Sequence, residues 1–141
     1  MTIIRHCGIV VRDMEISIAF YQKYFSFQIE SQNIEEGPFL EEILGLPGSR
    51  VKTVKLRGTA GSQLELLAFD FPESFPPRSL VQYGPTHLAL TVPNISMIYK
   101  RMLKANIEIT SPPKEAPNGD VKVMFCRDPD KTWLELVEEM R

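Results

Sequence analysis

The sequence predicts an α+β protein in which the order strand, helix, three strands occurs twice. Each half begins with one of the chain's two histidines, which opens a strand-like run of β-branched and aliphatic residues. A helix-capping residue follows each histidine seven positions later, and each half ends in a strand whose central glutamate lies between two leucines. In the order of the two halves, the matched positions are His6 and His87, Asp13 and Asn94, and Glu65 and Glu135. Such self-similarity is typical of a duplicated module.

The first module is predicted over residues 1–69. Asp13 caps a helix that runs to about Phe25, because apolar residues recur along it at steps of four and three. Strands are predicted at 3–11, 27–32, 50–57 and 62–69, and the last two form a hairpin.

The second module is predicted over residues 86–141. Asn94 caps its helix, and Asn106 is a plausible left-handed stop. Strands are predicted at 86–92, 107–110, 120–127 and 132–138, with a Pro-rich loop at 111–119.

Two segments break the repeat. Residues 70–85 hold four prolines and are predicted to link the modules. Residues 34–48 are an insertion, in which Pro38 and Gly45 suit the start and the end of one short helix. This helix is either a lid over a site or a packed surface excursion. A module of about 70 residues is close to marginal by itself. We therefore expect one domain whose modules pack on each other or on a partner chain, in a homodimer.

Composition excludes several functions. The net charge of −2 without a basic block argues against nucleic acid or an anionic membrane surface as a partner. No apolar run approaches the roughly 18 residues of a membrane span. The N-terminus enters a strand pattern directly, which argues against a signal peptide and for a cytoplasmic protein. Cys7 and Cys126 lack a C-x-x-C spacing and are expected to be reduced, buried thiols.

Strand alternation places the candidate ligands on one kind of face. In the first strand His6 shares a face with Gly8 and Val10, while the aliphatic side chains between them face the helix. The same alternation puts Glu65, His87 and Glu135 on the faces away from the helices. Two imidazoles and two carboxylates form a mixed nitrogen and oxygen set that suits Ni, Co, Mn, Fe(II) or Zn. The sequence therefore predicts a divalent metal site of His6, Glu65, His87 and Glu135.

With these motifs, the chain resembles the vicinal-oxygen-chelate superfamily, which includes glyoxalase I, methylmalonyl-CoA epimerase, extradiol dioxygenases and fosfomycin-resistance enzymes. The resemblance covers nearly the whole chain. It is specific at His6, in the helix start from Asp13 to Tyr21, at Glu65, at His87, and from Asp128-Pro129-Asp130 through Leu134-Glu135-Leu136. It implies two βαβββ modules whose sheets curl around an open metal-binding cleft. It also implies a small-molecule substrate with two neighbouring oxygens.

The ligand set is most similar to that of glyoxalase I, and the epimerase usually has glutamine at the position of Glu65. A bacterial-type glyoxalase I carries an arginine where this chain has Val10, which argues against glutathione as the thiol. The leading hypothesis is a lyase or isomerase in which Glu65 and Glu135 transfer a proton next to a metal-bound carbonyl. Its substrate would be a 2-oxo acid, a hemithioacetal or an acyl thioester. The alternatives are an Fe(II) extradiol-type dioxygenase and a non-catalytic binding or resistance protein.

Substrate contacts are harder to choose. Trp133, Gln63 and Thr91 fall on the same faces as the candidate ligands and are candidates for substrate binding. A substrate anion would need a cation, and six lie on or near strands that could border the cleft. These are Arg50, Lys52, Lys55, Arg57, Lys122 and Arg127.

Overall fold

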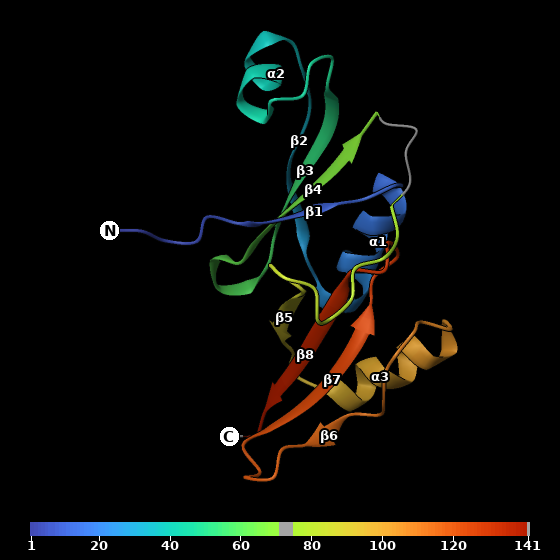
Figure 1. Ribbon diagram of the computed structural model, residues 1–141. Helices are drawn as coiled ribbons and strands as arrows, with labels where there is room; N and C mark the ends of the chain where they lie inside the picture. Colours follow the sequence, from blue (N-terminus) through green and yellow to red (C-terminus); the bar gives the residue numbers. More distant parts are fainter. Residues whose placement is uncertain (71–74, 141) are drawn as a thin grey trace. The chain divides into compact units, whose positions relative to one another are not determined.

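The computed structural model describes residues 1–70 and 75–140 and divides into two compact units, Met1–Ser74 and Phe75–Arg141. Each unit holds a four-stranded mixed sheet with a helix packed on one face, which confirms the predicted α+β class (Figure 1). Among the described residues, no helix is both long enough and apolar enough to cross a bilayer.

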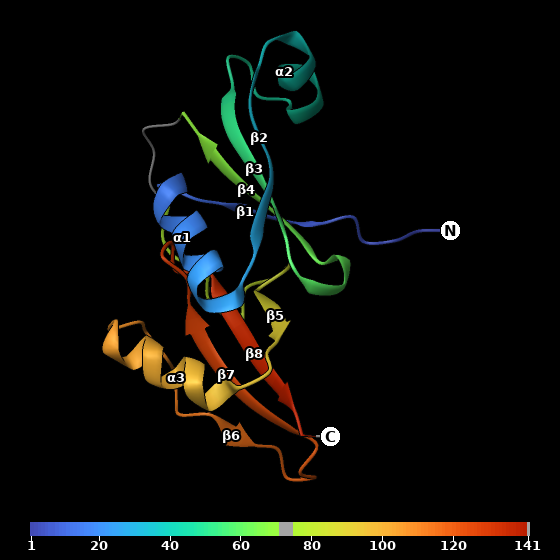
Figure 2. The same cartoon turned by 180° about the vertical axis from the view of Figure 1, so that it is seen from behind.

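The first unit has the sheet order β1-β4-β3-β2, in which β1 runs parallel to β4 and the other pairs are antiparallel. Its long helix, α1, contacts β4 and is seen from the other side in Figure 2. The elements are β1 (Cys7–Val10), α1 (Met14–Phe25), β2 (Gln28–Glu36), α2 (Pro38–Leu44), β3 (Arg50–Arg57), a 3₁₀ turn (Thr59–Gly61) and β4 (Gln63–Phe69).

The second unit repeats this topology with the order β5-β8-β7-β6, again with its first strand parallel to its last. Its helix, α3, packs on β7 and β8. The elements are β5 (His87–Thr91), α3 (Ile95–Lys104), β6 (Lys114–Glu115), β7 (Val121–Arg127) and β8 (Trp133–Glu139).

Both long helices begin at the predicted caps. The amide of Ile16 donates to Asp13 Oδ1 at 3.1 Å, and the amide of Met97 donates to Asn94 Oδ1 at 3.0 Å. Each bond satisfies one amide that has no partner within the helix. Alternate residues of the central strands turn inward beneath the helices and are fully buried, which separates a core face from an outer face in each sheet. The inward residues include Val54, Leu56, Leu64 and Leu66 in the first unit and Met124, Cys126, Leu134 and Leu136 in the second.

Three predicted strands differ from the structure. The first covers only 7–10 rather than 3–11, because its partner β4 begins at Gln63, directly after a turn, and leaves the earlier residues without a ladder. The strand predicted at 27–32 continues to residue 36 as β2. The strand predicted at 107–110 is only an isolated bridge, Ile109 to Cys126, and the sheet's edge strand lies after the two prolines, which cannot donate to a ladder.

The insertion folds as expected into one short helix, α2, between Gly37 and the left-handed Gly45. Leu40 is buried, whereas Phe39 and Ile43 are largely exposed. The helix contacts β2 at the end of the first sheet (Figure 1).

Candidate metal centre

The first unit brings His6 and Glu65 together. His6 directly precedes β1, and Glu65 lies in β4, where it pairs with Gly8. Residues that pair directly across a sheet point to the same face, and residues two apart on one strand do so as well. His6 Nε2 accordingly lies 3.7 Å from Glu65 Oε1, and both side chains are partly exposed.

The second unit repeats this arrangement with the same offset. Glu135 in β8 pairs with Ala89, two residues after His87, just as Glu65 pairs with the residue two after His6. His87 Nε2 lies 3.3 Å from Glu135 Oε1. The other ring nitrogen of His87, Nδ1, lies 2.9 Å from the hydroxyl of Thr86, which fixes the ring orientation.

Both pairs suit a divalent ion. Ligand atoms about 2.0–2.2 Å from an ion lie roughly 2.8–3.1 Å from each other at octahedral angles and roughly 3.3–3.6 Å at tetrahedral angles. The second pair already has such a spacing, at 3.3 Å, and the first, at 3.7 Å, is slightly wider. Each pair offers one imidazole nitrogen and one carboxylate oxygen, with no thiolate. Within either unit, the described residues add no third His, Cys, Asp or Glu to these pairs. That all four side chains share one ion stays a prediction.

Two aromatic side chains, Phe125 and Trp133, form an aromatic wall beside His87 and Glu135. Trp133 pairs with His87 across the strands, and Phe125 pairs with Glu135, so all four share a face. The ring of Phe125 meets that of His87 edge-on at 5.3 Å between centroids. The guanidinium of Arg127 stacks on Trp133 at 3.8 Å from the ring centroid. Trp133 is 7% exposed, and its Nε1 has no hydrogen-bond partner among the described residues.

The first unit is polar at the matching positions. Gln63, at the place of Trp133, donates from Nε2 to Glu30 Oε2 at 3.3 Å. Arg57 pairs with the other oxygen of Glu30, and Arg127 likewise pairs with Glu108 at 2.9 Å in the second unit. Lys55 pairs with Glu65 across the strands, at the place of Phe125. Of the three candidate substrate residues, Trp133 is buried, Gln63 partly exposed and Thr91 exposed.

Sequence reasoning named Lys55 only as one of six candidate cations, and it did not name Phe125. The signal that identifies them is the antiparallel register, which pairs each with a candidate ligand, Glu135 or Glu65. Sequence alone gives alternation within a strand but not the partner opposite each residue.

A separate hollow in the first unit lies next to α2. Its charges are already satisfied, because the guanidinium of Arg50 lies 3.0 Å from Glu36 and 2.9 Å from Asp70. These carboxylates raise the pKa of Arg50, chiefly through its hydrogen bond to Asp70. Glu41 accepts from the amide of Gly48 at 2.6 Å. Neither His6 nor Glu65 lines this hollow.

Two βαβββ units with a matched His–Glu pair on each outer face define a duplicated fold that carries side chains of the types that bind divalent metals. The chain belongs to the Glyoxalase/Bleomycin resistance protein/Dioxygenase superfamily, whose family model matches residues 3–136. This confirms the resemblance seen in the sequence.

Individual proteins and solved structures are similar to this chain over nearly its whole length. The chain is 31% identical over 138 residues to the uncharacterized protein YwkD of Bacillus subtilis (strain 168). The matched region covers 96% of this chain and 96% of that protein. Among solved structures, a glyoxalase family protein from Bacillus cereus is similar with a TM-score of 0.88, at 20% identity over 98% of this chain and 94% of that one. The trypanothione-dependent glyoxalase I of Leishmania major gives a TM-score of 0.67, at 20% identity over 99% of this chain and 88% of that one.

Proposed function

We propose that this protein is a metal-dependent lyase or isomerase that transfers a proton at the carbon next to a carbonyl of a small molecule. The observation that carries the proposal is the pair of matched His–Glu contacts, 3.7 Å in the first unit and 3.3 Å in the second. Membership of a superfamily that includes glyoxalase I among its structural relatives supports it.

His6, Glu65, His87 and Glu135 would together hold one ion of Ni, Co, Zn, Mn or Fe. When bound, such an ion would polarise the substrate carbonyl and make the neighbouring C–H more acidic. These four residues would leave one or two open positions on the ion for water or for substrate oxygens.

Glu65 is the residue we assign as the base. Its carboxylate is the more distant of the two from its histidine, at 3.7 Å against 3.3 Å, and a loosely held carboxylate is the freer to take a proton. Glu135 would return the proton from the other half of the repeat. Val10 is an exposed apolar residue on β1 and offers no charge to a glutathione carboxylate, so the proposal does not include glutathione.

Glu65→Gln tests the assignment. The full chain, loaded with each candidate ion, would be incubated in D₂O with three probes, and the loss of the C–H next to the carbonyl followed by proton NMR. The probes are 2-oxobutyrate, the hemithioacetal of methylglyoxal with 2-mercaptoethanol, and a methylmalonyl thioester. The amide can still coordinate but cannot accept the proton, so exchange should fall by roughly 100-fold or more with metal retained.

Glu35→Gln is the matched control, because Glu35 is an exposed residue of β2 and undergoes the same chemical change. Its exchange rate should equal that of the unaltered protein. Exchange that survives in Glu65→Gln contradicts the base role. Oxygen consumption that requires iron and survives this substitution would instead support a dioxygenase. Probe binding without any exchange would support a non-catalytic binding protein.

A further inference from the structure

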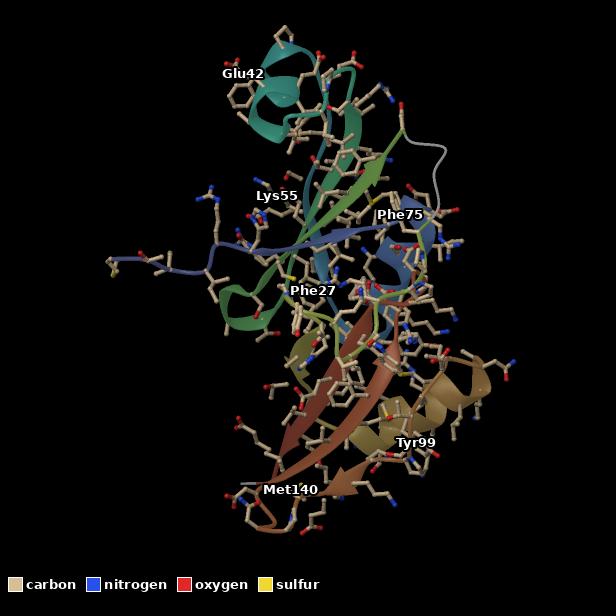
Figure 3. All side chains as sticks on the ribbon, in the orientation of Figure 1. Phe27, Glu42, Lys55, Phe75, Tyr99 and Met140 are labelled. Carbon is tan, nitrogen blue, oxygen red and sulfur yellow. The ribbon has the colours of Figure 1, made fainter. Side chains whose placement is uncertain are left out.

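Lys55 is placed to meet a ligand beside the first His–Glu pair. It lies on β3 directly opposite Glu65 and therefore on the same face of the sheet. Figure 3 labels it near the middle of the first sheet. The side chain is partly buried.

Within the part of the chain that the structure describes, the side chain of Lys55 forms no ion pair or hydrogen bond. Because no described carboxylate lies within ion-pair distance of its ammonium, this position leaves a positive charge available to an anionic ligand.

The other five candidate cations either form ion pairs with carboxylates or lie on the helix face of their sheet. Three arginines are paired with carboxylates: Arg50 with Glu36 and Asp70, Arg57 with Glu30, and Arg127 with Glu108. Lys52 reaches Glu15 of α1 at 3.7 Å and so lies on the helix face. Lys122 lies two residues before the buried Met124 on β7 and therefore on the same face, that of α3. Of these six cations, Lys55 is therefore the one that lies on the face of the His–Glu pair and forms no ion pair with a described carboxylate.

The second unit lacks this charge. Phe125 takes the place of Lys55 opposite Glu135, in a wall that also holds Trp133. The charge is thus specific to the first half of the repeat and is not required by the fold, since the same topology forms with a phenyl ring there.

We propose that Lys55 binds a carboxylate of the substrate, which lies next to, or near, the carbonyl at which the proton is transferred. This inference rests on the proposed function and narrows its three substrate classes to the two that can carry a free carboxylate, a 2-oxo acid and an acyl thioester of a dicarboxylic acid, and excludes a neutral hemithioacetal. A carboxylate fits better than a phosphate, because a single ammonium matches a single negative charge and the neighbouring arginines are already paired.

Lys55→Met tests this, with Lys52→Met as the matched control on the same strand and the opposite face. Binding of 2-oxobutyrate and of neutral butane-2,3-dione to the Zn-loaded full chain would be measured by NMR titration. Lys55→Met should weaken the binding of 2-oxobutyrate by roughly tenfold or more, which is the usual effect of losing a hydrogen bond to a charged group. The affinity for the dione should stay unchanged. Lys52→Met should change neither, and Lys55→Arg should largely restore binding of the acid.

A second readout works without metal. Reductive dimethylation with ¹³C-formaldehyde labels the lysines, and the Lys55 signal is identified by its absence in Lys55→Met. Adding 2-oxobutyrate should shift this signal in both metal-free and Zn-loaded protein. If the protein binds no metal but the signal still shifts, the proposed metal chemistry fails while the anion site stands. Unchanged binding of the acid by Lys55→Met, an equal loss of acid and dione, or a larger shift with inorganic phosphate would each overturn the proposal.

Discussion

If His6, Glu65, His87 and Glu135 share one ion, each chain binds one equivalent, and loss of either histidine abolishes binding. If the two pairs instead bind independently, His6→Ala or His87→Ala leaves the other pair intact. The two arrangements therefore differ in stoichiometry as well as in the response to a single substitution.

The expected magnitudes can be worked out for His87→Ala. An ion at 100 times its dissociation constant stabilises the folded chain by about 2.7 kcal/mol. For 141 residues, with an unfolding entropy of about 2.1 cal/mol/K per residue, this corresponds to a rise in Tm of about 9 °C. Removing the His87 ring also loses its edge-on contact with Phe125, 5.3 Å between centroids and worth about 1 kcal/mol, or some 3 °C. The loss of Tm that depends on bound metal is thus about three times the loss that does not.

The assay is differential scanning calorimetry of metal-free protein with and without added ion, with isothermal titration for stoichiometry. Asn33→Ala on β2, an exposed strand position, is the control and should keep the full metal-dependent rise. For His6→Ala and His87→Ala we expect that added ion no longer raises the Tm. The affinity for the ion should fall by more than the roughly 10- to 100-fold that is typical of changes to residues outside the ligand shell. Two equivalents in the unaltered protein, or a retained rise in either variant, would refute a shared site.

Two further predictions concern single contacts. Thr86→Val removes the hydroxyl 2.9 Å from His87 Nδ1 and should lower metal affinity by roughly 10-fold, measured by titration; an unchanged affinity would mean that the ring needs no such support. Cys126 is fully buried, and burial, with a smaller contribution from Asp128, raises the pKa of its thiol to about 12 from 9.0. It should stay unreactive toward Ellman's reagent at pH 8 until the protein unfolds. The unfolded thiol ionises first, so the free energy of unfolding should fall by up to about 1.4 kcal/mol per pH unit above pH 9, and a flat pH profile there would contradict the shift.

The duplicated architecture was predictable because each element carries its own local signal. Asp13 and Asn94 cap the helices as predicted, and Asn106 has the left-handed backbone, φ 56°, expected of a helix stop. Alternation along the strands also placed each histidine on the same face as its glutamate. These patterns depend on neighbours within one segment, which the sequence contains.

Pairing between segments could not be predicted. The first strand is short because β4 begins at residue 63, and the choice of Lys55 among six cations depended on which of the others reach a carboxylate. Both facts follow from strand register, which a single sequence does not encode locally. The homodimer, the cytoplasmic location, the lack of nucleic-acid or membrane partners and the shared ion stay predictions.

The arginine–glutamate pair that recurs at the end of the third strand of each unit makes the two halves separable. Arg57 with Glu30 and Arg127 with Glu108 are common to both units, while Lys55 and Phe125, two residues earlier, differ in charge and shape. Residues 55 and 125 each lie opposite the glutamate of their own His–Glu pair and take no part in the arginine–glutamate contacts. A substitution at either position can therefore change the surroundings of one His–Glu pair while the contacts common to both units stay in place.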